Sequence, residues 1–177
     1  MTHHASFVSP EAFKGLTLRY TDTYLTLYGP TFVAASGDEI VFWGFCSKVE
    51  AGGLRDALGR KWHNSAWQSD SEGVGALAER ARVASARLAL AGTPFQHRVW
   101  QKLLDIPKGE VASYKGLADA LGSAPRAIGG AVGANPVSLL VPCHRVLAAD
   151  KQLNGYRWGL EVKARILAAE GAAFQPA

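Results

Sequence analysis

Short apolar and β-branched runs separated by turn residues dominate residues 16–46, a pattern typical of β-strands. We expect strands at Leu16–Tyr20, Tyr24–Tyr28, Thr31–Ala35 and Ile40–Phe45, with a hairpin turn at Ser36–Asp38. The N-terminal part of the chain is therefore predicted to contain a sheet.

The pattern becomes helical and rich in alanine between Val49 and Leu90. Within Glu72–Leu90, apolar residues recur at three-to-four spacing and predict one amphipathic helix: Leu77, Ala81, Ala84 and Leu88. The breaker sequence Gly92-Thr93-Pro94 follows, so we expect two domains, residues 1–91 and residues 92–177.

The second domain opens with a helix-start signal. Thr93 suits an N-cap, Pro94 the first helical position, and Gln96 completes a capping box. After this first helix, the pattern predicts a helix at Tyr114–Leu121 and another from about Pro125 to Ala134. Two short helices joined by a tight turn that contains glycine are typical of a helix-turn-helix.

The last of these helices is almost free of bulky side chains. Glycine inside a helix costs roughly 0.5–1 kcal/mol relative to alanine, so Gly129, Gly130 and Gly133 require a reason. Either a neighbouring helix packs tightly against this one, or a partner approaches its backbone closely. The residues alone leave both alternatives open.

Composition narrows the class only slightly. A net charge of +4 and a pI of about 9.2 weakly favour a polyanionic partner. The two cysteines, Cys46 and Cys143, form no disulfide framework or Cys-rich zinc cluster, and no apolar run approaches membrane-spanning length. We expect a cytoplasmic protein without metal or cofactor, in which Cys46 packs at the end of a core strand.

The chemistry concentrates in the hexapeptide Val141-Pro142-Cys143-His144-Arg145-Val146. Thiolate is the nucleophilic form of cysteine, and a neighbouring imidazole or cationic group promotes its formation. Pro142 restricts the backbone before Cys143, which aims the thiol. A buried structural cysteine is the alternative, and we favour a nucleophile.

Further motifs occur around this hexapeptide in a fixed order. They are Gly92–Gln96, Val111–Tyr114, Arg126–Ala131, Asn135-Pro136 and Gly155–Gly159. In that order and spacing, residues 92 to about 170 resemble the O6-alkylguanine-DNA alkyltransferases, whereas residues 1–90 resemble that family only in outline. The resemblance implies an α/β (α+β) fold with a ribonuclease H-like N-terminal domain and a winged helix-turn-helix C-terminal domain that carries the cysteine.

The resemblance also implies single-turnover repair of double-stranded DNA that contains alkylated guanine. The alkyl group, mainly methyl, moves from guanine O6 to Cys143, and O4-alkylthymine is a second candidate substrate. His144 takes the thiol proton through a bridging water, and Glu170 orients and charges His144. The protein is expected to act as a monomer on chromosomal DNA, with no membrane and no obligatory protein partner.

Other roles follow from matching positions of the family. Tyr114 donates a proton to the leaving guanine, Asn135 orients the active-site turn, and Arg126 fills the base stack after the nucleotide flips out. Further DNA contacts are expected from Lys115, Ala127, Gly129 and Gly130. The substrate pocket is expected to involve Ser138, Val146, Tyr156, Arg157 and Trp158, with Arg145 as structural support.

Two departures from the family pattern stand out. The segment Gly122–Arg126 is about two residues shorter than the commoner spacing, and Trp158 occupies a position that is small in some members. The main alternative function is a non-catalytic damage-recognition protein, but such relatives carry tryptophan at the position of Cys143. A thiol enzyme of another fold is less favoured, because Cys46 on a core strand is a poor second thiol. A transcription factor is also less favoured, because the small side chains of the last helix do not suit base reading in the major groove.

Overall fold

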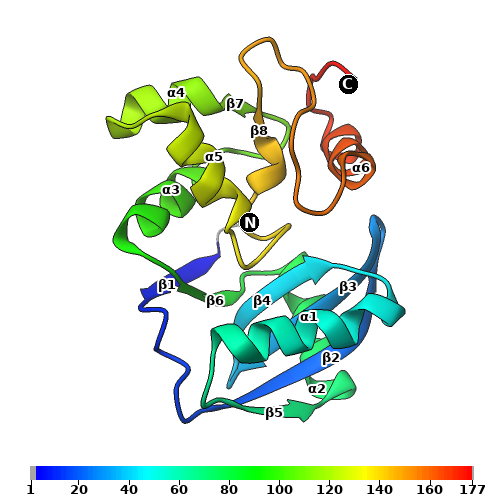
Figure 1. Cartoon of the computed structure of the whole chain (residues 1–177). Helices are drawn as coiled ribbons and strands as arrows, with labels where there is room; N and C mark the ends of the chain where they lie inside the picture. Colours follow the sequence, from blue (N-terminus) through cyan, green and yellow to red (C-terminus); the bar gives the residue numbers. More distant parts are fainter. Residues whose placement is uncertain (1–2, 177) are drawn as a thin grey trace. The chain divides into compact units, whose positions relative to one another are not determined.

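The computed structural model describes residues 3–176, and the chain divides into two units, residues 1–93 and 94–177 (Figure 1). The first unit is built on one mixed sheet. Its strand order is β1-β6-β4-β3-β2-β5, and the strands are β1 His4–Val8, β2 Thr17–Thr26, β3 Gly29–Ser36, β4 Glu39–Phe45, β5 Ala66–Ser69 and β6 Arg87–Ala91. Strands β2, β3 and β4 form an antiparallel meander. The parallel pairs are β1 with β6, β4 with β6, and β2 with β5.

Helices α1 (Lys48–Lys61) and α2 (Ser71–Val83) complete the first unit. Ser47 caps α1 through a reciprocal capping box with Glu50, and Asp70 caps α2. Four successive residues of β3, from Phe32 to Ala35, are fully buried, so both faces of the sheet are covered there. The mixed α/β architecture agrees with the prediction, and the ribonuclease H-like description stays a prediction.

Two sequence expectations for this unit are wrong in part. The strands expected at Leu16–Tyr20 and Tyr24–Tyr28 form the single strand β2, whose pairing with β3 is irregular between Thr21 and Tyr24. The helix expected over Glu72–Leu90 ends at Val83, and Leu88 lies instead on the buried strand β6. A short apolar run of leucine and alanine suits a buried strand as well as a helix, and only pairing with β1 and β4 decides between them.

The second unit is mainly helical, as predicted. It contains α3 (Pro94–Leu104), α4 (Tyr114–Leu121), α5 (Pro125–Gly133) and α6 (Leu160–Glu170). The α4 helix begins after the N-cap Ser113 and ends at Gly122, whose φ of 60° is the left-handed conformation that favours glycine. Gly122, Ser123 and Ala124 join the two helices expected for a helix-turn-helix, and the winged form stays a prediction.

Two packing contacts bring the later segments of this unit together. The Trp100 indole of α3 is fully buried and donates a hydrogen bond of 2.9 Å to the Ala131 carbonyl of α5. The short strands β7 (Ala112–Ser113) and β8 (Val146–Leu147) pair in parallel. Because β7 leads directly into α4 and β8 follows the Cys143 turn, this pairing places Tyr114 beside the segment that carries the thiol. No helix in the described part of the chain is long and apolar enough to span a membrane.

Candidate active site

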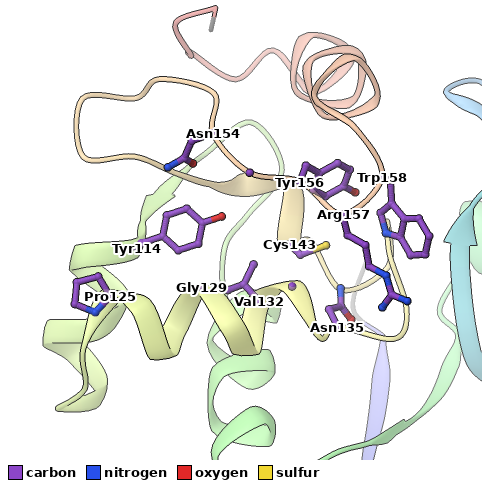
Figure 2. Close-up of a pocket in the computed structure, with 12 residues that line it drawn as sticks. Tyr114, Pro125, Gly129, Val132, Asn135, Cys143, Asn154, Tyr156, Arg157 and Trp158 are labelled. Atoms are coloured by element: carbon purple, nitrogen blue, oxygen red, sulfur yellow. The ribbon is translucent and has the colours of Figure 1, made fainter. Parts of the chain in front are cut away.

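Cys143 opens a 3₁₀ turn, Cys143–Arg145, directly before β8. Its side chain borders a cavity of about 570 Å³ and is only 5% exposed. Figure 2 shows the cavity between α5, the Cys143 turn and the loop before α6. Its walls are Tyr114, Pro125, Gly129, Val132, Gly133, Asn135, Cys143, Asn154, Gly155, Tyr156, Arg157 and Trp158.

Asn135 braces the loop that leads to the thiol. Its side-chain amide donates to the Val141 carbonyl at 2.9 Å, and its side-chain oxygen accepts from the Val137 N–H at 3.0 Å. Asn135 is 2% exposed, so these hydrogen bonds are shielded from water. Asn135 therefore holds the loop before Cys143 by buried hydrogen bonds, and its role in orienting the active-site turn stays a prediction.

His144, Glu170 and Arg145 form a compact hydrogen-bonded group next to the turn that carries the thiol. His144 is fully buried, and its Nε2 lies 3.2 Å from Glu170 Oε1. Arg145 donates twice to the same carboxylate, from Nε at 2.9 Å and from Nη2 at 2.7 Å, and also to the Ile106 carbonyl at 2.6 Å. Arg145 thus connects the turn that carries Cys143 to α6 and to the segment after α3, and its supporting role stays a prediction.

The pKa shifts at Cys143 and His144 favour a neutral thiol and a neutral imidazole in the resting protein. Burial raises the pKa of the Cys143 thiol, although Asn135, Tyr156, Ser138 and the Lys163 charge lower it. Burial lowers the pKa of His144 more than Glu170 raises it. The Nδ1 atom of His144 is buried and has no hydrogen-bond partner among residues 3–176, so a neutral imidazole is available as a proton acceptor.

Glu170 stays ionised in this setting. Burial alone raises its pKa, but hydrogen bonds from Arg145 and His144 outweigh burial and lower the pKa to about 2. An ionised carboxylate beside Nε2 holds the imidazole in one orientation and stabilises a positive charge that forms on it.

Two tyrosines face the cavity. Burial and the nearby Cys143 raise the pKa of Tyr114 and raise that of Tyr156 well above its ordinary value. Both phenols therefore keep their protons at neutral pH and can donate them. The Tyr156 hydroxyl approaches Cys143 but completes no hydrogen bond with any described residue.

Lys163 of α6 is a site residue that the sequence interpretation missed. It is fully buried, and its ammonium donates to the carbonyls of Val146 at 2.8 Å and Asn154 at 2.9 Å. Burial lowers its pKa to about 8, while the nearby Cys143 raises it. A signal was present, because Lys163 lies three and four residues before Ile166 and Leu167, on the buried stripe of its helix.

The predicted pocket residues divide into two groups. Tyr156, Arg157 and Trp158 line the cavity, whereas Ser138 and Val146 are fully buried and do not. The Trp158 indole N–H donates to the Ser138 hydroxyl, and the Arg157 guanidinium lies 4.7 Å from the centroid of the Trp158 ring. The Val146 carbonyl accepts a hydrogen bond from the Lys163 ammonium.

The predicted DNA-contacting residues lie on α4 and α5. Arg126, Ala127 and Gly130 are exposed, and Lys115 is exposed in an ion pair with Asp119 at 2.7 Å. A Cβ added to Gly130 or Gly133 would meet nothing within 4 Å, and one at Gly129 would lie 3.9 Å from the Tyr114 ring. Tight packing against a neighbouring helix therefore does not explain the glycines at 130 and 133.

Charge is distributed unequally between the two units. Residues 94–177 contain ten Lys or Arg and six Asp or Glu, whereas residues 1–93 contain nine of each. The whole net charge of +4 therefore belongs to the unit that carries the cavity. Among the described residues, no group of His, Cys, Asp and Glu could hold a metal ion.

A buried Cys-His-Glu group at a cavity beside a helix-turn-helix defines a class of proteins with a buried thiol next to a DNA-binding element. The model of the 6-O-methylguanine DNA methyltransferase DNA-binding domain matches residues 94–172. A Mycobacterium tuberculosis O6-methylguanine methyltransferase has a similar structure, with a TM-score of 0.68 and 30% identity over 88% of this chain and 93% of that one. The chain belongs to the O6-methylguanine-DNA methyltransferase family, and its mixed α/β fold is the fold of that family.

Other relatives agree with this assignment. A M. tuberculosis structure described as OGT in complex with DNA is 31% identical, with a TM-score of 0.68 over 88% of this chain and 93% of that one. A Candida albicans methylated-DNA–protein-cysteine methyltransferase is 50% identical over 82 residues, or 46% of this chain. The Escherichia coli bifunctional transcriptional activator/DNA repair enzyme Ada is 44% identical over 101 residues, or 56% of this chain. The matches span 47% and 28% of those two curated relatives.

Proposed function

We propose that this protein repairs double-stranded DNA by moving an alkyl group, mainly methyl, from guanine O6 to Cys143, once per molecule. O4-alkylthymine is a second candidate substrate. In this proposal residues 92–177 bind DNA and carry out the transfer, and residues 1–91 are mainly structural. The protein acts as a cytoplasmic monomer.

The proposal rests on one observation above the others: a buried Cys143-His144-Glu170 arrangement at the wall of a cavity bordered by α5. The cavity volume of about 570 Å³ lies within the roughly 300–1,000 Å³ of small-molecule sites, which suits a single base. The nucleotide must turn out of the helix, because the thiol cannot reach guanine O6 while the base is inside the duplex.

Transfer begins when His144 takes the Cys143 proton through a bridging water and Glu170 stabilises the resulting imidazolium. The thiolate attacks the alkyl carbon, so an S–C bond forms while the C–O6 bond breaks and its electron pair stays on guanine. Tyr114 then supplies a proton to the guanine anion. The product thioether is a poor leaving group, so the protein is consumed in one turnover.

DNA binding is assigned to α4 and α5. The exposed small residues Ala127 and Gly130 allow the α5 backbone to approach the narrow minor groove, which carries little base information. Arg126 is exposed at the start of α5, where it can occupy the place of the flipped base. Lys115 contributes a positive charge toward phosphate.

The test is incubation with O6-methylguanine duplex, followed by intact-protein mass and peptide mapping. The expected result is one added methyl group per molecule, on the peptide that contains Cys143. Cys46→Ser is the matched control and should accept the same amount, because Cys46 lies in the other unit. Tight binding of the duplex without any mass change would instead support the non-catalytic recognition protein.

A further inference from the structure

Trp158 is held by two different contacts on the wall of the cavity. Its indole N–H donates to the Ser138 hydroxyl, and the Arg157 guanidinium covers its ring at 4.7 Å. Both contacts fix the orientation of the indole, since an N–H has one direction and a cation requires the ring face. The Trp158 N–H edge is therefore directed away from the cavity, toward the segment that precedes Cys143.

Ser138 lies in that segment with no exposed surface. The surrounding backbone groups bond to one another: the Leu140 N–H donates to the Ser138 carbonyl at 2.9 Å, and the Val141 N–H donates to the Val137 carbonyl at 3.0 Å. The Ser138 side chain therefore has no role in holding these backbone groups. Its oxygen accepts from Trp158, which leaves its one hydrogen to be directed elsewhere.

Two possible acceptors lie near the Ser138 hydroxyl. They are the Cys143 sulfur and the Tyr156 hydroxyl. Burial raises the pKa of each of these groups, and the nearby Ser138 hydroxyl lowers it. Once Cys143 loses its proton, the sulfur carries a full negative charge and is the stronger acceptor of the two. A hydroxyl that already accepts a hydrogen bond also donates more strongly, so the two bonds reinforce each other.

We propose that Trp158, Ser138 and Cys143 form a hydrogen-bond chain, in which the indole N–H orients the serine hydroxyl and the hydroxyl donates to the thiolate. Ser138 and Trp158 are then positioning residues for the nucleophile. The consequence for repair rests on the proposed function, but the chain itself concerns only the ionisation of Cys143. It gives Trp158 an electrostatic role in addition to the space that its ring occupies.

Other groups also act on the thiol and have to be separated from this chain. Around Cys143 these groups are Asn135 on the preceding loop, Tyr114 of α4, Tyr156 and Arg157 on the following loop, and Lys163 of α6. His144 follows the thiol on the same turn. None of them depends on the indole N–H. Removing that N–H while keeping an aromatic ring therefore isolates the proposed chain.

The experiment uses the chain of 177 residues with Cys46→Ser, in which Cys143 is the only cysteine. The rate of Cys143 alkylation by iodoacetamide is measured against pH in the parent, Ser138→Ala, Trp158→Phe and the double variant. Trp67→Phe is the matched control, because its buried indole N–H has no hydrogen-bond partner among the described residues. Transfer from methylated duplex is measured in parallel, and circular dichroism checks the fold of each variant.

Ser138→Ala is expected to move the inflection of the profile upward by about one to two pH units, the range for a lost hydrogen bond to a charged group. Trp158→Phe should move it upward by less than about one unit, because the hydroxyl remains but is no longer oriented. In the Ser138→Ala background, Trp158→Phe should add nothing, and Trp67→Phe should leave the profile unchanged.

Two results would overturn the proposal. One is a Ser138→Ala profile that superimposes on that of the parent. The other is a Trp158→Phe shift of the same size in both backgrounds, which would mean that the indole acts without Ser138. A parent protein that accepts no methyl group from DNA, yet shows the expected shifts, would refute the repair function and support the chain.

Discussion

Replacement of Glu170 by glutamine tests how much the ion pair behind the thiol stabilises the second unit. The Glu170 side chain is 9% exposed and is held by two hydrogen bonds from Arg145, at 2.7 and 2.9 Å. The pKa of Glu170 falls from 4.5 to about 2 on folding, because hydrogen bonds from Arg145 and His144 outweigh the effect of burial. At about 1.4 kcal/mol per pH unit, the ionised carboxylate contributes at most about 3.5 kcal/mol to the free energy of unfolding near neutral pH.

The sign of this contribution fixes its pH dependence. A carboxyl group whose pKa is lower in the folded state stabilises the protein above its unfolded pKa, and the contribution disappears as the pH falls through the folded value. The difference in unfolding free energy between parent and Glu170→Gln should therefore be constant above about pH 5. It should shrink by about 1.4 kcal/mol per unit as the pH falls from about 4.5 toward 2.

Urea unfolding at several pH values measures this difference, with hydrogen exchange of peptides from residues 94–177 reporting on the second unit separately. Glu161→Gln is the matched control, because Glu161 is exposed at the start of the same helix and should change little at any pH. A difference between parent and Glu170→Gln that stays constant down to about pH 2.5 would refute the argument from the lowered pKa.

Three further predictions concern the proposed reaction. Cys143→Ala should lose alkyl transfer but keep its affinity for methylated duplex in an anisotropy titration, since nucleotide flipping does not use the thiol; simultaneous loss of binding in a folded variant would place the site elsewhere. Arg126→Ala should slow repair of duplex far more than of a single-stranded substrate, because unstacking costs a few kcal/mol only where a stack exists, and equal losses would give Arg126 a structural role. Trp158→Gly should raise the rate with benzylated guanine relative to methylated duplex, since the indole lines the cavity, and an unchanged ratio of the two rates would exclude a steric role.

Local sequence signals predicted the elements whose ends are set by local chemistry. Ser113 and Gly122 delimit α4 through an N-cap and a left-handed residue, and Pro94 begins α3. The sequence Ser36-Gly37-Asp38 likewise predicted the hairpin turn between β3 and β4, where Gly37 adopts a φ of 57°. By contrast, the sequence predicts a helix where β6 lies, because a run of leucine and alanine does not show which strands will pair with it.

The sequence by itself determined which residues stand together at the turn, because Cys143 and His144 are adjacent and Pro142 precedes them in the chain. The resemblance also named Glu170 and Ser138, and only the tertiary structure decided how these distant residues lie around the thiol and that Lys163 joins them. Glu170 lies 26 residues from His144 in the chain, yet reaches it at 3.2 Å. Lys163 and Ser138 reach the same site through burial, since a buried polar group must find a partner wherever the packed chain provides one. Hydrogen bonding between distant segments depends on how helices and loops pack, which no local pattern records.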